Sequence, residues 1–154
     1  MNAVLRWIAG FGAMALLVVA MAGPANAATS KVKLRNQATG TRLMTKEATN
    51  LVSMKLAGAA NQIWTKTDTT GGYATYSQGT LCLTGRSLQG FPLVTAEKCV
   101  AGATKQQWRK GVSGDLQLRM NGLVAEVNTA SPAFLLRMAF FTAKPNQKWF
   151  ELAA

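Results

Sequence analysis

The chain has 154 residues, which is enough for one ordinary domain and too few for two domains with a linker. Hydrophobic residues make up 49% of it and charged residues 15%, and this balance excludes an intrinsically disordered protein. The chain contains seventeen Lys and Arg residues and six Asp and Glu residues, so its formal net charge is +11, and it contains no histidine. Without histidine, Ser–His and Cys–His catalysis and most zinc sites are excluded, and we expect no metal and no cofactor. Two cysteines, Cys82 and Cys99, are too few for a disulfide-scaffold fold but can form one bridge.

The segment from Met1 to Ala27 has the order of a secretory signal peptide. Positions 8–22 form an uncharged apolar run after the single charge of Arg6, Gly23-Pro24 follows, and Ala25-Asn26-Ala27 is a small-x-small cleavage signal. The alternative is a membrane anchor, but the run is shorter than the roughly 20 residues that a spanning helix needs. We therefore expect cleavage after Ala27 and a secreted protein, extracellular or periplasmic, with no transmembrane segment after cleavage. Export also permits a disulfide.

Three of the four tryptophans lie in the same tripeptide, Gln-x-Trp, and they divide the rest of the chain into three repeats. The tripeptides end at Trp64, Trp108 and Trp149, so the two intervals between them are nearly equal. A Gly-Thr-x-x-x-Thr pattern recurs at 40–45 and 79–84, with a form one residue tighter at 122–127. Recurrence at a fixed period indicates a repeat architecture. We bound the repeats at 28–68, 69–111 and 112–154.

The local signals within each repeat predict β-strands. Positions 31–35 and 115–120 alternate polar and apolar side chains, which is typical of a strand with one buried face. Turn dipeptides such as Thr39-Gly40, Gln78-Gly79 and Asn121-Gly122 separate the short runs. Four short strands in each repeat predict an all-β, three-fold barrel, whose closure leaves no exposed sheet edge. In this fold the three tryptophans anchor a shared core, and we favour a structural role for the preceding glutamines over direct ligand contact.

Three Gln-x-Trp repeats at this spacing resemble the ricin B-type lectin family, and the resemblance covers positions 28–154. It implies a β-trefoil fold with four short strands in each repeat, and a carbohydrate-binding function. Many members of the family bridge each repeat with two cysteines, and Cys82 and Cys99 are so placed in the second repeat. The resemblance therefore implies that these two cysteines are bridged.

A sugar site in that family uses an acidic residue after the second strand, a glutamine and an aromatic residue on the third strand, and an Asn-Gln pair before the tryptophan. The third repeat matches best, with Glu126 at or beside the acidic position and the pair Asn146-Gln147. Its third strand offers Arg137, with Phe140 just beyond to supply a stacking face. The first repeat keeps Asn61-Gln62 and is the second candidate, and no repeat holds the full set. The alternative is that Asn146-Gln147 only stabilises a turn and Glu126 is a solvated surface acid.

The basic charge is a second functional indication. Cleavage after Ala27 removes Arg6, which lowers the net charge of +11 by one and leaves the protein strongly basic. Lys31, Lys33 and Arg35 project from one face of a strand, because side chains alternate along it. This charge favours acidic partners such as an anionic glycan, lipid phosphate or lipopolysaccharide. Nucleic acid is not expected as the partner of an exported protein, and the alternative is a merely soluble basic exoprotein.

Catalysis has little support in the sequence. The six carboxylates form no evident pair, and positions 28–154 leave no room for a separate catalytic domain, so we expect no enzymatic activity. We predict a secreted carbohydrate-binding module with a degenerate sugar site in the third repeat. The alternative is a protein-interaction module, such as the binding subunit of a toxin or an inhibitor, and the degenerate sugar positions favour it.

Overall fold

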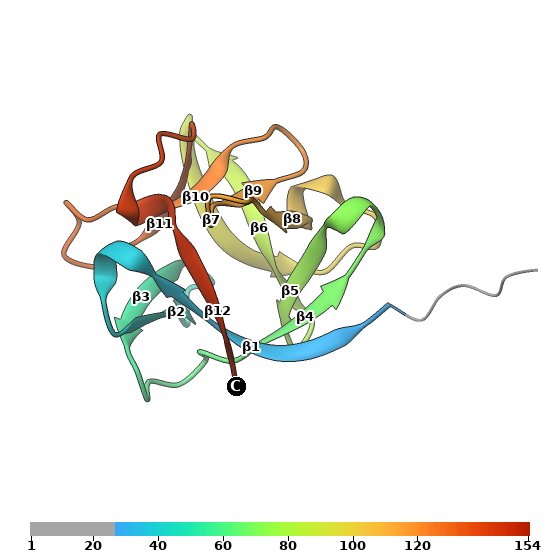
Figure 1. Cartoon of the computed structure of the whole chain (residues 1–154), viewed down its shortest axis with the longest axis horizontal. Coiled ribbons are helices and arrows are strands. Elements are labelled where there is room, and N and C mark those ends of the chain that lie inside the picture. The colour runs from blue at the N-terminus through green and yellow to red at the C-terminus, as the bar shows by residue number, and fades with distance from the viewer. Residues whose placement is uncertain (1–26) are drawn as a thin grey trace, which may run out of the picture.

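The computed structural model describes residues 27–154, so the predicted signal peptide lies outside the described residues apart from Ala27. The described chain is built of twelve strands and four short 3-10 turns, with no α-helix (Figure 1). Among these residues no helix has the length and apolar character needed to cross a membrane.

Each repeat supplies four strands. The first repeat contains β1 (Thr29–Asn36), β2 (Arg42–Lys46), β3 (Val52–Leu56) and β4 (Trp64–Asp68). The second contains β5 (Ala74–Gln78), β6 (Leu81–Leu88), β7 (Phe91–Lys98) and β8 (Trp108–Lys110). The third contains β9 (Leu116–Leu118), β10 (Val124–Val127), β11 (Leu136–Ala139) and β12 (Trp149–Ala153). The 3-10 turns are η1 (Gln37–Thr39), η2 (Thr70–Gly72), η3 (Thr104–Gln106) and η4 (Pro145–Gln147).

The first and last strands of the three repeats form a six-stranded antiparallel barrel. Its pairs are β1 with β12 and β4, β4 with β5, β5 with β8, and β8 with β9. A bridge between Asp115 and Lys148 links the start of β9 to the start of β12 and completes the ring. Figure 1 shows the closure, with the C-terminal strand β12 beside β1. Closure pairs the first strand with the last, and both would otherwise leave exposed edges.

The two middle strands of each repeat form a hairpin that caps the barrel. The hairpins are β2–β3, β6–β7 and β10–β11. They meet one another through the pairs Leu51–Thr95 and Ser53–Leu135, and β7 pairs with β11 at Leu93 and Arg137. Three repeats of four strands around one axis are a β-trefoil, so the predicted fold is confirmed.

Recurring residues of the sequence account for the three-fold core. Trp64, Trp108 and Trp149 are each at most 1% exposed and belong to a single buried cluster. The glycines that open the recurring pattern, Gly40 and Gly79, have φ of 61° and 58°. This left-handed conformation suits glycine, which has no Cβ to clash, and it turns the chain sharply into β2 and β6.

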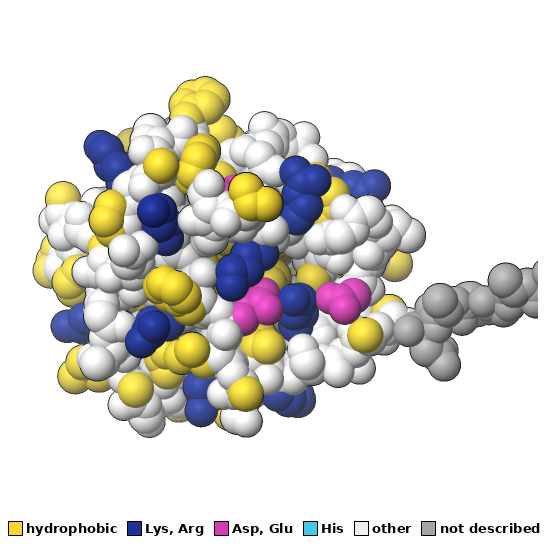
Figure 2. Space-filling model, viewed as in Figure 1, with side chains coloured by type: hydrophobic (Ala, Val, Ile, Leu, Met, Phe, Trp, Pro, Cys, Tyr) yellow, Lys and Arg dark blue, Asp and Glu magenta, His cyan; other side chains and the backbone are white. Residues whose placement is uncertain are grey.

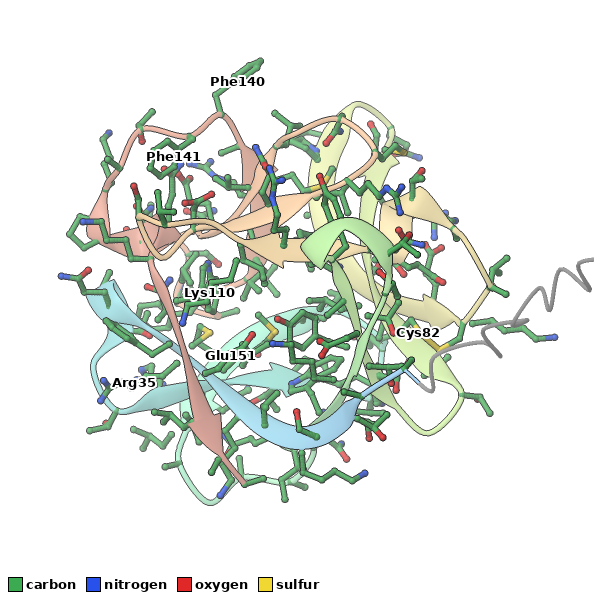
Figure 3. The ribbon with its side chains drawn as sticks, turned by 45° about the vertical axis from the view of Figure 1, so that its right-hand side comes forward. Arg35, Cys82, Lys110, Phe140, Phe141 and Glu151 are labelled. Carbon is green, nitrogen blue, oxygen red and sulfur yellow. A yellow bond between two sulfur atoms is a disulfide. The ribbon has the colours of Figure 1, made fainter. Side chains whose placement is uncertain are left out.

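The cysteines are bridged as predicted. Cys82 on β6 and Cys99 just after β7 form a disulfide with their Cα atoms 4.9 Å apart. The pairing of β6 with β7 sets Cys82 opposite Glu97, so the bridge joins the base of one hairpin within the second repeat. Figure 3 shows Cys82 on the second-repeat side of the molecule.

Candidate functional site

The tryptophans occupy equivalent positions with equivalent hydrogen bonds. Each indole N–H donates to a backbone carbonyl on the second strand of its own repeat. The acceptors are Met44 O for Trp64 (3.2 Å), Leu83 O for Trp108 (2.9 Å) and Ala125 O for Trp149 (2.9 Å). A buried indole N–H needs such a partner, so these contacts fix the rings as well as burying them.

The glutamine of each tripeptide is buried, and both its amide nitrogen and its amide oxygen form hydrogen bonds within the protein. Its amide nitrogen donates to a side chain on the second strand and to a carbonyl near the end of the third strand, while its amide oxygen accepts from a turn N–H. The second-strand partners are Thr45 for Gln62 (3.2 Å), Thr84 for Gln106 (3.1 Å) and Glu126 for Gln147 (2.8 Å). The turn donors are the N–H groups of Gly58, Val100 and Thr142. These glutamines therefore connect three elements of each repeat.

Glu126 occupies the position of Thr45 and Thr84 in the other repeats. The shared glutamine contact shows the equivalence, and the one-residue shift matches the tighter pattern at 122–127. Glu126 is 5% exposed, so it is not a solvated surface acid. Its Oε2 accepts from Gln147, and its Oε1 accepts from Arg137 Nε at 2.7 Å. Both carboxylate oxygens are thus engaged within the repeat.

Arg137 pairs with Glu126 across the β10–β11 ladder, where the two residues are directly opposite. Its Nη2 lies 2.5 Å from Glu126 Oε1, and half of the arginine side chain remains exposed, at 49%. An arginine has several N–H donors in a fixed plane, and those not used by Glu126 face outward. The third repeat thus presents a guanidinium donor at the surface rather than a bare carboxylate.

These residues line a pocket of about 450 Å³ that we call the third-repeat pocket. Its polar side chains are Glu126, Asn128, Thr129, Arg137, Lys144 and Asn146, and Ala38, Ala130 and Pro145 supply the apolar part of its wall. Glu126, Arg137 and Asn146 were predicted from the sequence to meet here, whereas Asn128 and Thr129 were missed. Strand alternation could have found Asn128, because it follows Glu126 by two residues and extends the same face of β10.

Asn146 lies in the third-repeat pocket but also has a structural contact. Its side-chain amide donates to Val127 O at 3.1 Å, and its backbone carbonyl accepts from the Asn36 side chain at 3.0 Å. These bonds tie η4 to β10 and to the end of β1. The amide oxygen of Asn146 has no hydrogen bond among the described residues and is the part that remains for a ligand.

Phe140 lies apart from the other residues that the sequence predicted for the sugar site. It follows the last residue of β11, is 82% exposed, and does not line the third-repeat pocket. Figure 3 shows its ring pointing outward from the edge of the molecule, with Phe141 nearby. The expected stacking contact with a sugar beside Glu126 therefore does not fit this placement. Phe140 is three residues from Arg137, so alternation along β11 would place it on the opposite face, with the buried Leu136 and Met138, and the strand ends before it.

The second candidate, Asn61-Gln62, borders a larger pocket of about 630 Å³, the first-repeat pocket. Lys31, Lys33, Asn61, Gln62, Ser77 and Gln78 line it, together with the exposed loop 57–60. Asn61 has a φ of 60° and its carbonyl accepts from Gln78 and from the Lys46 N–H. No carboxylate lines this pocket, so its charge is that of the two lysines.

The lysines of β1 lie on its outer face, as alternation predicts. Val32, Leu34 and Asn36 are buried, whereas Lys31, Lys33 and Arg35 are exposed or half-buried. Arg35 lies with its guanidinium carbon 5.0 Å from the centre of the Phe150 ring on β12. Figure 2 shows that Lys and Arg side chains are spread over the visible face, with few acidic side chains among them. The positive charge is therefore distributed rather than confined to β1.

All four glutamates of the chain are in ion pairs with Lys or Arg. Burial raises the pKa of the Glu97 carboxyl, but hydrogen bonds and attraction from Lys105 and then Arg86 outweigh it and leave this pKa below its ordinary value. Burial likewise raises the pKa of Glu151, and the Tyr76 hydroxyl and Lys66 outweigh it, so the pKa is lowered. A general acid needs a raised pKa, so these carboxyls are suited to ion pairing rather than proton donation.

No group of three or more His, Cys, Asp or Glu side chains that could hold a metal ion occurs in residues 27–154. The surface of this part of the chain carries shallow, hydrogen-bonding pockets on a rigid trefoil. Such pockets can bind a polar ligand through convergent donors and acceptors.

The comparison with protein families identifies the chain. The profile of the Ricin-type beta-trefoil lectin domain matches residues 30–149, which is most of the sequence. The chain belongs to this family. The ricin-type lectin domain is a carbohydrate-binding module, and the resemblance inferred from the Gln-x-Trp repeats is confirmed. No curated protein matches the chain in sequence.

Solved structures similar to this ricin-type domain share its fold at low sequence identity. A designed three-fold symmetric protein, ThreeFoil, matches with a TM-score of 0.69 and 20% identity over 80% of this chain and 99% of its own. A mosquitocidal holotoxin matches with a TM-score of 0.72 and 16% identity over 82% of this chain and 17% of its own. A non-toxic homologue of type II RIPs from Momordica charantia, in complex with α-methyl-D-galactoside, matches with a TM-score of 0.66 and 13% identity over 80% of this chain and 48% of its own. The chain thus spans less than half the length of the two natural proteins.

Proposed function

We propose that this ricin-type domain is a secreted carbohydrate-binding module that holds a saccharide in the third-repeat pocket. The observation that carries the proposal is the convergence of Arg137, Lys144, Asn128 and Asn146 on one pocket of about 450 Å³. The hydroxyl and ring oxygens of a sugar accept hydrogen bonds from Arg137, Lys144 and Asn128, and a sugar hydroxyl can donate to the Asn146 amide oxygen. The galactoside complex of the Momordica charantia homologue supports a saccharide as the ligand class.

The role of Glu126 in this pocket is to orient Arg137. Because both carboxylate oxygens already accept hydrogen bonds, the outward face of the site consists mainly of donors. Gln147 holds the other side of Glu126 and so fixes the carboxylate from behind. We infer that a ligand meets the Arg137 guanidinium, with Glu126 and Gln147 acting as its support.

A glycan array on the protein beginning at Ala28, followed by titration of the best ligand, tests the proposal. Ala130→Trp fills the third-repeat pocket with a large side chain from an exposed position, without changing any charge. We expect this variant to lose binding. The matched control is Ala59→Trp, which fills the first-repeat pocket in the same way and should bind as the wild type does. Loss of binding in Ala59→Trp alone, or in neither variant, contradicts the proposal.

Secretion is part of the proposal and has its own measurement. The uncharged run at 8–22 and the Ala25-Asn26-Ala27 signal support cleavage after Ala27. Intact-mass analysis of protein recovered outside the cytoplasm should show a chain that begins at Ala28. A secreted chain that still begins at Met1 contradicts this part.

A second function, a protein-interaction module, is favoured by a different observation. Phe140 is 82% exposed and Phe91 is 69% exposed. Phe140 directly follows β11, which pairs with β7, the strand that Phe91 begins. Large exposed aromatic side chains are typical of binding surfaces.

The double variant Phe91→Ser, Phe140→Ser tests this second function. It should lose capture of a partner from the medium of the secreting cell while its glycan binding stays unchanged. If this variant captures the same partner as the wild type, the aromatic surface is not the interface.

A further inference from the structure

Two arginines share one aromatic ring at the junction of the second and third repeats. The guanidinium carbons of Arg109 and Arg119 each lie 5.1 Å from the centre of the Tyr73 ring. Both arginine side chains are at the surface, outside the third-repeat pocket. We call this group of three residues the double-arginine cluster.

The strand register builds the double-arginine cluster. In the β8–β9 pair, Arg109 is directly opposite Gln117, and the Arg119 N–H donates to Gln107 O just beyond the pair. Because side chains alternate along a strand, these four side chains project from one face of the ribbon. On the other side of β8, Ala74 pairs with Trp108, which sets Tyr73 beside Arg109. Backbone pairing thus holds together residues that are distant in sequence.

Neutral amides, not carboxylates, hold the two guanidinium groups. Arg109 Nη2 donates to Gln117 Oε1 at 2.8 Å, and Arg119 Nη1 donates to Gln107 Oε1 at 2.5 Å. Gln107 is only 6% exposed, so its amide is a fixed partner. Gln117 is held in turn by its own donation to Gly122 O at 3.1 Å. The cation–π contact with Tyr73 orients both groups further.

Among residues 27–154, no carboxylate forms an ion pair with either arginine of the cluster. Asp115, two residues before Gln117, and Asp68, opposite Ala74, lie near the cluster in register, and neither forms an ion pair with either arginine. Arg86 and Arg137, in contrast, are paired with Glu97 and Glu126. Two like charges that contact one aromatic ring without a carboxylate partner repel each other, and an anion bound beside them relieves the repulsion.

We propose that the double-arginine cluster is a second binding site, which takes an oxyanion group, a sulfate ester or a carboxylate, of an acidic polysaccharide. Planar guanidinium groups match such oxyanions through paired N–H donors. Positions held in advance by Gln107, Gln117 and Tyr73 reduce the ordering cost of binding. The inference that the oxyanion belongs to a polysaccharide rests on the proposed carbohydrate-binding function. The inference that an oxyanion binds here rests only on the geometry of the cluster.

The experiment measures binding of the protein beginning at Ala28 to dextran sulfate and to polygalacturonate at several salt concentrations. The double variant Arg109→Gln, Arg119→Gln should bind at least one polymer about tenfold more weakly at moderate salt, because two charge-assisted contacts are lost. The double variant Arg109→Lys, Arg119→Lys keeps the charge and should still bind more weakly, because an ammonium group lacks the planar fork. Unfolding midpoints equal to that of the wild type show that both variants are folded.

The matched control is Arg42→Gln. Arg42 is a single arginine 4.7 Å from the centre of the Phe134 ring, with no carboxylate partner among the described residues. Its removal should change binding by less than twofold. If Arg42→Gln weakens binding as much as the double Gln variant, or if the double Gln variant binds as the wild type does, the cluster is not a specific site.

Two further measurements identify the molecule that carries the oxyanion and show whether this site is independent of the third-repeat pocket. Duplex DNA and phosphatidylglycerol vesicles should bind more weakly than the acidic polysaccharides at equal salt. Tighter binding to either one overturns the polysaccharide as the carrier.

Ala130→Trp should keep its binding to the acidic polymer through the cluster, even though it loses the ligand of the third-repeat pocket. If Ala130→Trp loses both, the two sites are one and the proposed second site is wrong.

Discussion

Glu126 and Gln147 are joined by a hydrogen bond of 2.8 Å from the glutamine amide to the carboxylate. The equivalent glutamines of the other repeats donate to the hydroxyls of Thr45 and Thr84. One position of the three-fold frame therefore carries a glutamate in place of a threonine and keeps the structural contact. The additional carboxylate oxygen holds Arg137, and this is how a structural position becomes part of a candidate binding pocket.

The ion pair of Glu126 with Arg137 can be tested with a double-mutant cycle. Arg137→Ala should cost about 1–3 kcal/mol of unfolding free energy, because it leaves the buried Glu126 charge without a cation. Adding Glu126→Thr should recover most of this loss, since threonine occupies the position in the other repeats. Urea unfolding of Arg137→Ala, of Glu126→Thr, of the double variant and of the wild type measures the cycle.

The control for this cycle is Arg86→Ala. Arg86 is half-exposed and shares Glu97 with Lys105, so the Glu97 charge keeps one cation and the loss should stay below about 1 kcal/mol. If the double variant has the same unfolding free energy as Arg137→Ala, the loss in Arg137→Ala does not come from an unpaired Glu126 charge, and the expectation is wrong.

The three tryptophans should contribute equally to stability. Each is at most 1% exposed and donates one indole hydrogen bond to the second strand of its repeat. Changing Trp64, Trp108 or Trp149 to Ala should cost about 3–5 kcal/mol, as is usual for a buried aromatic residue. Denaturant unfolding gives the three values, and a variant that keeps the wild-type midpoint would refute three-fold equivalence.

The disulfide closes a loop between residues that are 17 positions apart in sequence. Loss of such a bridge should cost roughly 3 kcal/mol, because the unfolded chain regains the freedom of the open loop. The measurement is urea unfolding with and without a reductant, and the double variant Cys82→Ala, Cys99→Ala serves as the control that a reductant no longer affects. Equal midpoints for the oxidised and reduced wild type would contradict the expectation.

Stability should fall in acid partly because of Glu151. Its pKa is lowered from the ordinary value of 4.5, since the hydrogen bonds from Tyr76 (2.5 Å) and Lys66 (3.0 Å) outweigh the effect of burial. A carboxyl with a lowered pKa in the folded state stabilises that state fully above its unfolded pKa, and the contribution is lost as the pH falls through the folded pKa. Urea midpoints measured from pH 7 down through the acid range should decline below pH 4.5, and less steeply in Glu151→Gln. An identical decline in both proteins would assign the acid sensitivity to other groups.

The fold was predictable because its signals are local and repeated. The Gln-x-Trp tripeptides, the glycines at positive φ and the alternation at positions 31–35 each recur or extend within one repeat, and each reports a structure formed by near neighbours. Closure of the barrel follows from repetition, since three similar units leave no strand unpaired. The bridge between Cys82 and Cys99 also joins the two ends of one hairpin, since Cys99 directly follows β7.

The sites were less predictable because they depend on register between strands. Arg137 faces Glu126 only because β10 and β11 pair in one alignment, which the length of the intervening loop does not reveal. Tyr73 meets Arg109 through the pairing of β5 with β8, which are distant in sequence. Phe140 also depends on register, because it lies three residues from Arg137 and so does not share the face of β11 that carries Arg137.

The most direct test of the central claim is a ¹⁵N–¹H NMR titration of the protein beginning at Ala28 with the best saccharide from the array. We predict that the shifted signals belong to the third-repeat pocket, namely the side-chain amides of Asn128 and Asn146 and the backbone amides of Thr129 and Ala130. The signals of the first-repeat pocket, including Gly58 and Asn61, should stay unchanged. Shifts at Gly58 and Asn61 without shifts at Asn128 and Ala130 would contradict the account and move the sugar site to the first repeat.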